Sequence, residues 1–297
     1  MYTMTDAIKS ERWVYLIDWE EGPAAHVKDL ILLGYDHFSR AMPLTNHVHE
    51  DAYEFVYMEQ GTAVWEVNGQ FHPTSAQHII YTRPGERHRA SFDYIGPCRI
   101  WWIIVRDPLQ HGHWFGLDDA ERQVFAQWIH RCPRIQLVSK EIVDYFKRVQ
   151  QLINQQDTEL VEFQIRHGVL EILQRILHNT PLKAQSHDMH AYTLELKTRL
   201  EQNPSERYTI GQLASEIGLS ESHFYRIFRE MNGQSPTAFM DRIRMDCACR
   251  MLEESKVSIT DVAMELGFKT SQHFATVFKK LIGVTPKAWR THSKVCN

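Results

Sequence analysis

The hydrophobic pattern of the first third of the chain is that of a β-rich domain. From about Trp13 to Asp107, short runs of β-branched and aromatic residues end at Gly, Pro, Asn or Asp, as in FVYMEQ, TAVWEVNG, AQHIIYTRPG and RIWWIIVRD. Such runs predict strands. The Asn68-Gly69 dipeptide predicts a two-residue hairpin turn, because both residues tolerate positive φ. Many short strands joined by turns favour an antiparallel sandwich or barrel.

After residue 138 the apolar period becomes helical. Between Ser139 and Asn179, apolar side chains recur three or four positions apart in two stretches separated by the polar NQQDTE. This spacing predicts two amphipathic helices. PLKAQSHDMHA, residues 181–191, has almost no apolar content and is interpreted as a linker. The remainder is almost wholly helical in pattern. We therefore expect an α+β multidomain chain with segments 1–138, 139–180, 181–191 and 192–297.

One pattern of about twenty residues occurs twice in the last segment. GLSESHFYRIFREMNGQSP and GFKTSQHFATVFKKLIGVTP share their aromatic, second glycine and Ser/Thr-Pro positions at an offset of 50, and their first glycines at an offset of 49, because the turn of the second copy has one more residue. A helix precedes each copy, over 210–217 and 259–266. Gly218 and Gly267 are expected to end these helices, because glycine takes the left-handed conformation without steric penalty. A second helix with a stripe of apolar residues follows in each copy, which predicts two helix-turn-helix motifs.

The second helix of such a motif reads the major groove of DNA. Its outward residues are predicted to be Ser222, Tyr225, Arg226 and Arg229 in the first copy, and Ser271, Gln272, Thr276, Lys279 and Lys280 in the second. Arg226 and Gln272 are the predicted base readers, because Arg pairs with guanine and Gln with adenine through two hydrogen bonds. The remaining cations are assigned to phosphates. A tandem helical repeat with solvated charged faces is the simpler alternative. The matched glycines and the long helix expected over 237–255 argue against it.

The last hundred residues resemble the AraC/XylS family of transcriptional regulators. The pattern GF-x5-F-x3-FKK-x2-G-x-TP-x3-R, ending at Arg290, is similar to the family signature, and RIRMDCACRMLEES resembles the connecting helix, with Arg244 and Ala248 in place. The resemblance implies two recognition helices on one face of double-stranded DNA, and activation through RNA polymerase. Thr276 departs from the family, which often has Arg there, so the second helix is expected to read bases weakly.

A second set of motifs lies among the predicted strands. NHVHEDAYEFVYMEQG contains His47-x-His49-x4-Glu54, and RPGERH contains His88. These resemble the two cupin motifs, whose residues converge inside a small β-barrel, although Arg83 stands where cupins usually have proline. His47 and His49 are two apart, so both are expected to face inward from one strand. Three imidazoles and a carboxylate can hold a divalent metal such as Zn, Mn, Fe or Ni.

Three interpretations of this set stay open. The residues line a pocket for a small polar effector without metal, they bind a metal that is structural or helps to hold the effector, or they bind a catalytic metal as in cupin oxygenases and isomerases. AraC-type regulators often keep the HxH and Glu pattern without a metal. We therefore expect no required cofactor, with a divalent metal as the alternative.

Tryptophans suggest what the effector is. In RIWWIIVRD, Trp101 and Trp102 face opposite sides of their strand, so only one can enter the barrel, and resemblance to the arabinose-sensing member of the family favours Trp102. An indole stacks on the apolar face of a sugar ring, which favours a carbohydrate effector. Arg40 is expected to pair with a hydroxyl or carboxylate. The expected effector site is Arg40, His47, His49, Glu54, His88 and Trp102.

Charge and composition change this picture little. The net charge is -4, but 15 Lys and Arg face 12 Asp and Glu from His190 onward, a balance compatible with nucleic acid. The five cysteines form no paired framework, the first residues lack a signal-peptide profile, and no long apolar run occurs. We expect a cytoplasmic homodimer, built through the 139–180 helices, that is a regulator and not an enzyme. The alternatives are a cupin metalloenzyme and an effector-independent regulator whose cupin only dimerises.

Overall fold

The computed structural model describes most of the chain. The described residues are 11–16, 27–110, 112–155, 159–178, 184–232, 234–254 and 257–293. They form two compact units, and each is considered by itself. The first comprises Met1–Ser39, Thr45–Asp93 and Cys98–Leu182, and the second comprises Arg40–Leu44, Tyr94–Pro97 and Lys183–Asn297.

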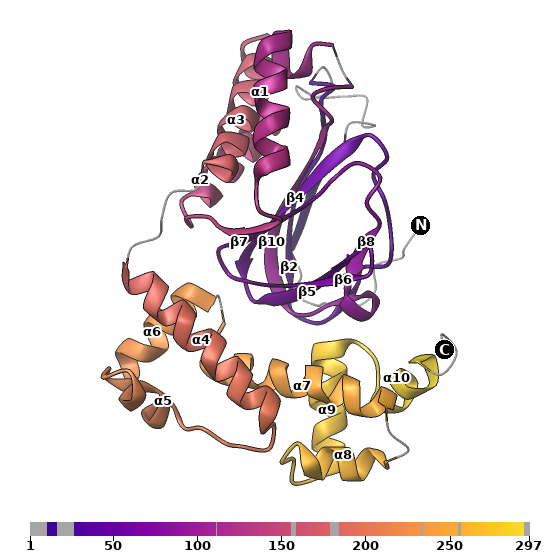
Figure 1. Ribbon diagram of the computed structural model, residues 1–297, viewed down its shortest axis with the longest axis vertical. Coiled ribbons are helices and arrows are strands. Elements are labelled where there is room, and N and C mark those ends of the chain that lie inside the picture. The colour runs from indigo at the N-terminus through magenta and orange to yellow at the C-terminus, as the bar shows by residue number, and fades with distance from the viewer. Residues whose placement is uncertain are drawn as a thin grey trace. The chain divides into compact units, whose positions relative to one another are not determined.

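The first unit is built on antiparallel sheets (Figure 1). The six strands of the largest sheet are, in spatial order, β1 (Glu11–Leu16), β2 (Leu30–Phe38), β10 (Cys98–Arg106), β4 (Ala52–Gln60), β7 (His78–Thr82) and β11 (Ile135–Leu137). A three-stranded sheet has the order β6 (Gln70–Ser75), β5 (Thr62–Val67) and β8 (His88–Ala90). A short pair, β3 (Met42–Pro43) and β9 (Tyr94–Ile95), forms a third sheet, whose residues belong to the second unit. The predicted antiparallel β fold is confirmed.

The turn between β5 and β6 follows the predicted hairpin chemistry. Asn68 and Gly69 have φ of 49° and 80°, and Val67 pairs with Gln70 across the turn. Positive φ at both central residues matches the right-handed twist of the flanking strands.

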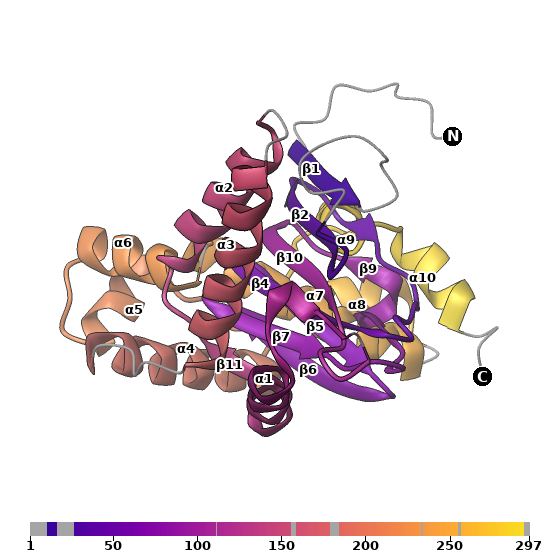
Figure 2. The same cartoon turned by 90° about the horizontal axis from the view of Figure 1, so that it is seen from above.

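Three helices cover one face of the six-stranded sheet. α1 (Asp119–Arg131), α2 (Ile142–Ile153) and α3 (Glu159–Leu177) bury their apolar stripes in one cluster with residues of β2, β4, β7 and β10, and α2 lies beside α3 (Figure 2). The predicted helix pair after residue 138 is confirmed. α1 was not expected. Its signal is Asp118-x-x-Glu121, which forms a capping box at its start.

The second unit is helical, as predicted. Its helices are α4 (Ala184–Gln202), α5 (Ile210–Glu216), α6 (Glu221–Asn232), α7 (Pro236–Glu254), α8 (Ile259–Glu265), α9 (Ser271–Ile282) and α10 (Pro286–Ser293). Pro236 and Pro286 each occupy the first helical position, where proline costs no hydrogen bond. Ser235 and Thr285 cap these starts by accepting from the amides of Ala238 and Ala288, at 3.2 Å in each case.

The linker predicted over 181–191 is wrong for its described part, because residues 184–191 belong to α4. Residues 181–183 lie outside the described residues. Met189, Tyr192, Leu196 and Leu200 are buried at spacings of three and four, which is the helical period. The apolar stripe therefore begins inside the segment whose polar composition suggested a linker. Among the described residues, none of the helices combines the length and the apolar character that crossing a bilayer requires.

Candidate functional site

The first helix-turn-helix consists of α5 and α6. Thr209 and Gln212 form a capping box at the start of α5, and Gly218, with φ of 68°, makes the turn. Phe224 and Phe228 on α6 are fully buried, with ring centroids 5.4 Å apart. Burial of these rings fixes which face of α6 remains exposed.

The second helix-turn-helix, α8 and α9, repeats the plan. Gly267 has φ of 74°, and the side chain of Thr270 caps α9 by accepting from the amide of His273. Phe274 and Phe278 are fully buried, with centroids 5.6 Å apart. Both predicted motifs are therefore present with the expected buried stripes. Gly233, one of the repeated glycines, lies outside the described residues, and Gly283, its counterpart, has φ of 98°.

The predicted DNA-contacting residues lie on the faces left open by this burial. All are exposed except Ser271, which is half-buried: Ser222, Tyr225, Arg226, Arg229, Gln272, Thr276, Lys279 and Lys280. Arg226 and Gln272 lie in the N-terminal halves of their helices, where a recognition helix meets base edges. Lys279 and Lys280 lie in the last turn of α9, where a cation also interacts favourably with the helix dipole. The Thr276 hydroxyl donates to the carbonyl of Gln272 at 3.0 Å.

The connecting helix α7 joins the two motifs. It contacts α4 and α6 on the side of the first motif and α8, α9 and α10 of the second. Its 19 residues span about 28 Å, comparable with the roughly 34 Å that separates major-groove segments one helical turn apart. Arg244 and Ala248 are buried at 2% and 0% exposure. α7 is therefore a spacer of suitable length with a buried arginine at its centre.

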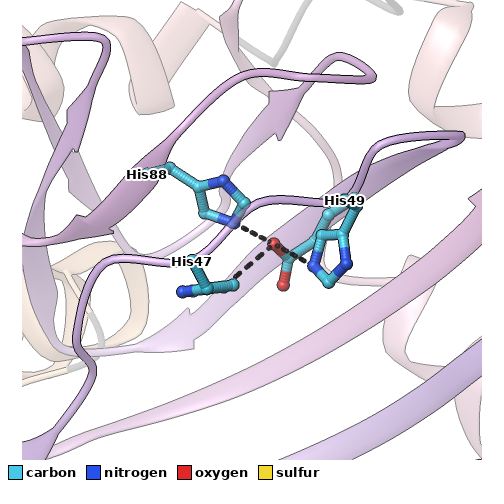
Figure 3. Close-up of side chains that lie close together, drawn as sticks. His47, His49 and His88 are labelled. Carbon is cyan, nitrogen blue, oxygen red and sulfur yellow. Dashed lines mark hydrogen bonds and ion pairs between the residues drawn. The ribbon is translucent and has the colours of Figure 1, made fainter.

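In the first unit, the predicted histidines and glutamate come together (Figure 3). The imidazole Nε2 atoms of His88, His49 and His47 lie 2.6, 3.6 and 3.8 Å from Oε2 of Glu54. Glu54 comes from β4 and His88 from β8, whereas His47 precedes β4 and pairs with the backbone of His88 in an isolated bridge. The regular strand expected for the HxH residues is thus reduced to one bridge, yet both imidazoles still reach the carboxylate.

Backbone carbonyls orient two of these imidazoles. Nδ1 of His47 lies 2.8 Å from the carbonyl of Thr45, and Nδ1 of His88 lies 3.0 Å from that of Glu86. A ring nitrogen facing a carbonyl donates its proton to it, so these two contacts fix the ring orientations and leave Nε2 as the atom that faces Glu54. Nε2 of His49 is buried and makes no hydrogen bond to the described part of the chain. The ligand atoms of all four residues lie within 4.8 Å of one another, an arrangement that a divalent metal fits.

The members of the cluster shift one another's pKa values. Burial of Glu54 favours its neutral form, but the three surrounding imidazoles outweigh this effect and hold the pKa of Glu54 well below its usual range. Glu54 in turn raises the pKa of His47. The side chains of His47 and His49 keep 35% and 26% of their surface exposed, whereas that of His88 keeps 2%. A ligand can therefore reach the cluster from the side of His47 and His49.

The two adjacent tryptophans face opposite sides of β10, as predicted. Trp101 belongs to the helix-covered cluster and stacks on Phe146 with centroids 5.4 Å apart. Trp102 faces the side of the six-stranded sheet opposite the helices, called the barrel side below, and Glu54 shares this side because Trp102 pairs with Val56, two residues from Glu54 on β4. Arg40 is exposed and lies in the segment 40–44, which does not belong to the barrel unit.

Asp36 is a buried acid that sequence reasoning missed. It lies on β2, is 4% exposed, and pairs with Ile100, two register positions from the pair of Gly34 and Trp102, so it faces the barrel side as they do. Burial raises the pKa of Asp36 to about 7, although Arg12, with Nε 3.7 Å from Oδ1, opposes the rise. Its signal is an acidic residue at an inward position of the strand LILLGYDHF.

Comparison with known proteins identifies two domains in this chain. Residues 213–292 match the family model of a helix-turn-helix domain, and residues 41–104 match that of a cupin domain. The transcriptional activator RhaS of Escherichia coli O81 (strain ED1a) is 23% identical over 241 residues, which cover 80% of this chain and 85% of the relative. RhaS of Escherichia coli O139:H28 (strain E24377A / ETEC) is 23% identical over 242 residues, with the same coverage.

Similar solved structures include a transcriptional regulator with an AraC-type DNA-binding domain from Chromobacterium violaceum, at 22% identity and a TM-score of 0.34, covering 37% of this chain and 96% of that chain. ToxT from Vibrio cholerae is 9% identical with a TM-score of 0.33, covering 86% and 98%. The cupin and helix-turn-helix matches, in this order along one chain that carries both sites, support an AraC-type DNA-binding transcriptional regulator with a cupin domain N-terminal to a double helix-turn-helix domain.

Proposed function

We propose that this protein activates transcription by binding adjacent major-groove segments through α6 and α9, under the control of a small polar effector held in the cupin domain. The proposal of DNA binding rests on one observation: α6 and α9 each expose a polar face, and the connecting helix α7 joins their two motifs. Arg226 and Gln272 are the proposed base readers, and Arg229, Lys279 and Lys280 the phosphate contacts. Contact with RNA polymerase would complete the activator.

Selection of duplexes from a random pool by the full chain, followed by anisotropy titrations, tests the DNA part. Arg226→Ala should weaken binding by about 1–3 kcal/mol and relax preference at one base position. Lys280→Ala should weaken binding equally for all sequences and reduce the salt slope by about 1. If no duplex is enriched at low salt, the proposal fails. If Arg226→Ala behaves like Lys280→Ala, Arg226 contacts a phosphate instead.

For the effector, we propose a neutral carbohydrate bound between the His47/His49/Glu54/His88 cluster and Trp102. Two observations support this: the cluster is accessible from the side of His47 and His49, and the Trp102 indole shares the barrel side with Glu54. The indole offers an apolar face to a sugar ring, and the imidazoles and carboxylate offer hydrogen-bond partners for hydroxyls.

A panel of neutral sugars in a thermal-shift assay tests this site. Trp102→Leu and Glu54→Gln should each weaken the binding of an active sugar at least about tenfold, the loss of one good polar or stacking contact. Trp128→Leu is the matched control, because Trp128 lies on α1 and is 40% exposed. A protein that responds to no sugar but still binds DNA would be an effector-independent regulator.

A divalent cation is the second candidate ligand, because the oriented imidazoles of His47 and His88 present Nε2 toward Glu54. When bound, such an ion would supply a Lewis acid for effector hydroxyls. Equilibrium dialysis with Zn²⁺ alone should show one site in the wild type and none in His88→Ala. We expect a regulator rather than an enzyme; turnover by the metal-loaded protein without salt-sensitive DNA binding would reverse that expectation.

For the homodimer, we propose the outer face of α3. Leu160 and Phe163 are 64% and 57% exposed, while Val161, Ile165 and Ile172 of the same helix are buried against the unit's own core. One helix can therefore serve both contacts. Phe163→Glu should shift the mass measured by light scattering from dimer to monomer, and an unchanged mass would rule this face out.

A further inference from the structure

The segment Asn203–Tyr208, between α4 and α5, has contacts beyond its own helix-turn-helix. It precedes α5 of the first motif in the chain, and most of its side chains are exposed. Its backbone carbonyls and Arg207 nevertheless reach two other elements of the second unit, α7 and the turn between α8 and α9. We refer to Asn203–Tyr208 as the strap.

Arg244 attaches the strap to α7. Its guanidinium donates from Nε to the carbonyl of Pro204 at 3.0 Å and from Nη2 to the carbonyl of Glu206 at 2.8 Å. A third hydrogen bond, to Asp241 at 3.2 Å, orients the group within α7. Two carbonyls of one short segment are therefore satisfied by a single buried cation.

Arg207 attaches the strap to the second motif. Its Nη2 donates to the carbonyl of Gly267 at 2.6 Å, and its guanidinium lies over the ring of Phe268, 5.5 Å from the centroid. Gly267 is the turn residue that sets the entry of α9. A Cβ at Gly267 would lie 3.0 Å from the carbonyl oxygen of Ser205, so the strap and the turn are in close contact.

The strap is also tied to the first motif. Arg199 at the end of α4 pairs with both carboxylate oxygens of Glu216 on α5, at 3.2 and 2.7 Å. The Tyr192 hydroxyl donates to the same carboxylate at 2.7 Å, and the guanidinium of Arg199 lies 5.2 Å from the ring centroid of Tyr208. A continuous set of contacts thus runs from α5 through α4 and the strap to the turn of the second motif.

We propose that the strap is a second connection between the two helix-turn-helix motifs, and that Arg207 is a positioning residue that fixes the spacing of the two recognition helices and so the spacing of the DNA elements they accept. The proposal rests on DNA binding by both α6 and α9. Without the strap, α7 would be the sole connection between the motifs, and small rotations about its axis would displace α9. The Arg207 contact at the turn that leads into α9 restrains those rotations. Less conformational entropy is therefore lost when DNA binds.

The test compares two duplexes: the sequence selected by the wild-type full chain, and the same sequence with one base pair inserted between the two elements. The insertion moves one element by roughly 3.4 Å and rotates it by about 35°. Wild type should lose about 100-fold in affinity on the insertion, the cost of one or two lost base contacts. Arg207→Ala should bind the selected duplex about 5- to 10-fold more weakly, and its insertion penalty should fall to about 10-fold.

Two further variants make the result specific. Lys197→Ala removes a cation of α4 whose ion pair, with Glu201, lies within the same helix, and it should keep the full insertion penalty. Gly267→Ala, which presses on the strap carbonyl, should reduce the penalty as Arg207→Ala does, with circular dichroism confirming that the helices persist. An unchanged penalty in folded Arg207→Ala overturns the proposal. So does an equal loss on both duplexes with a smaller salt slope, since Arg207 would then be a phosphate contact. If the wild type enriches no duplex, DNA binding itself fails.

Discussion

Arg244→Met should destabilise the second unit, because it removes the one side chain that satisfies two strap carbonyls. Methionine keeps the length and apolar stem of the arginine but has no donor. Each hydrogen bond from a charged group contributes about 1.5–3 kcal/mol. Burial lowers the pKa of Arg244, which reflects the cost of desolvating its charge, and removing that cost offsets part of the loss. We expect the free energy of unfolding to fall by about 2–3 kcal/mol.

Hydrogen exchange followed by mass spectrometry of the full chain measures this value for the second unit alone. A loss of 2–3 kcal/mol accelerates the slowest amides of α7 by about 30- to 140-fold. Arg250→Met is the control on the same helix, because Arg250 is exposed and its guanidinium donates to Cys247 within α7 rather than to the strap. The control should change the free energy of unfolding by less than about 0.5 kcal/mol. An Arg244→Met protein whose slowest amides accelerate less than about twofold would show that the strap is not held by this residue.

Three further predictions concern the two cores. Gly34→Ala should lower the unfolding free energy of the barrel by about 1–3 kcal/mol in urea titrations, because a Cβ there would overlap the ring of Trp102; no change would mean that the indole moves freely. The pKa of Asp36 is about 7 in the fold and about 4 in the unfolded chain, so barrel stability should be highest below pH 4 as far as this group is concerned. It should fall by about 2–4 kcal/mol as the pH rises through 7, and thermal melts of Asp36→Asn should lack this component. Phe278→Ala should cost about 3–5 kcal/mol, whereas Lys279→Ala should leave stability within about 0.5 kcal/mol and lower only DNA affinity; equal effects would contradict the assignment of buried and open faces.

The local features of the fold could be predicted from the sequence because their causes lie within a few residues. The Asn68-Gly69 turn, the αL glycines at 218 and 267, and the phenylalanine stripes of α6 and α9 each follow from backbone sterics or from a spacing of three and four. The same locality explains the errors. The polar composition before residue 191 concealed the first turns of α4, and the capping box of α1 was overlooked inside a region of strands.

By itself, then, the sequence determined the two kinds of periodicity, the repeated motif and the set of histidines with Glu54. Only the tertiary structure decided which face of each strand is covered by helices, and so that Trp101 enters the helix-side core while Trp102 joins Glu54. It also brought His88 to Glu54 across 34 residues, and Arg207 to Gly267 across 60. The physical reason is that strand alternation and helix period define two faces for every element, but pairing and burial between distant segments determine which face meets which partner.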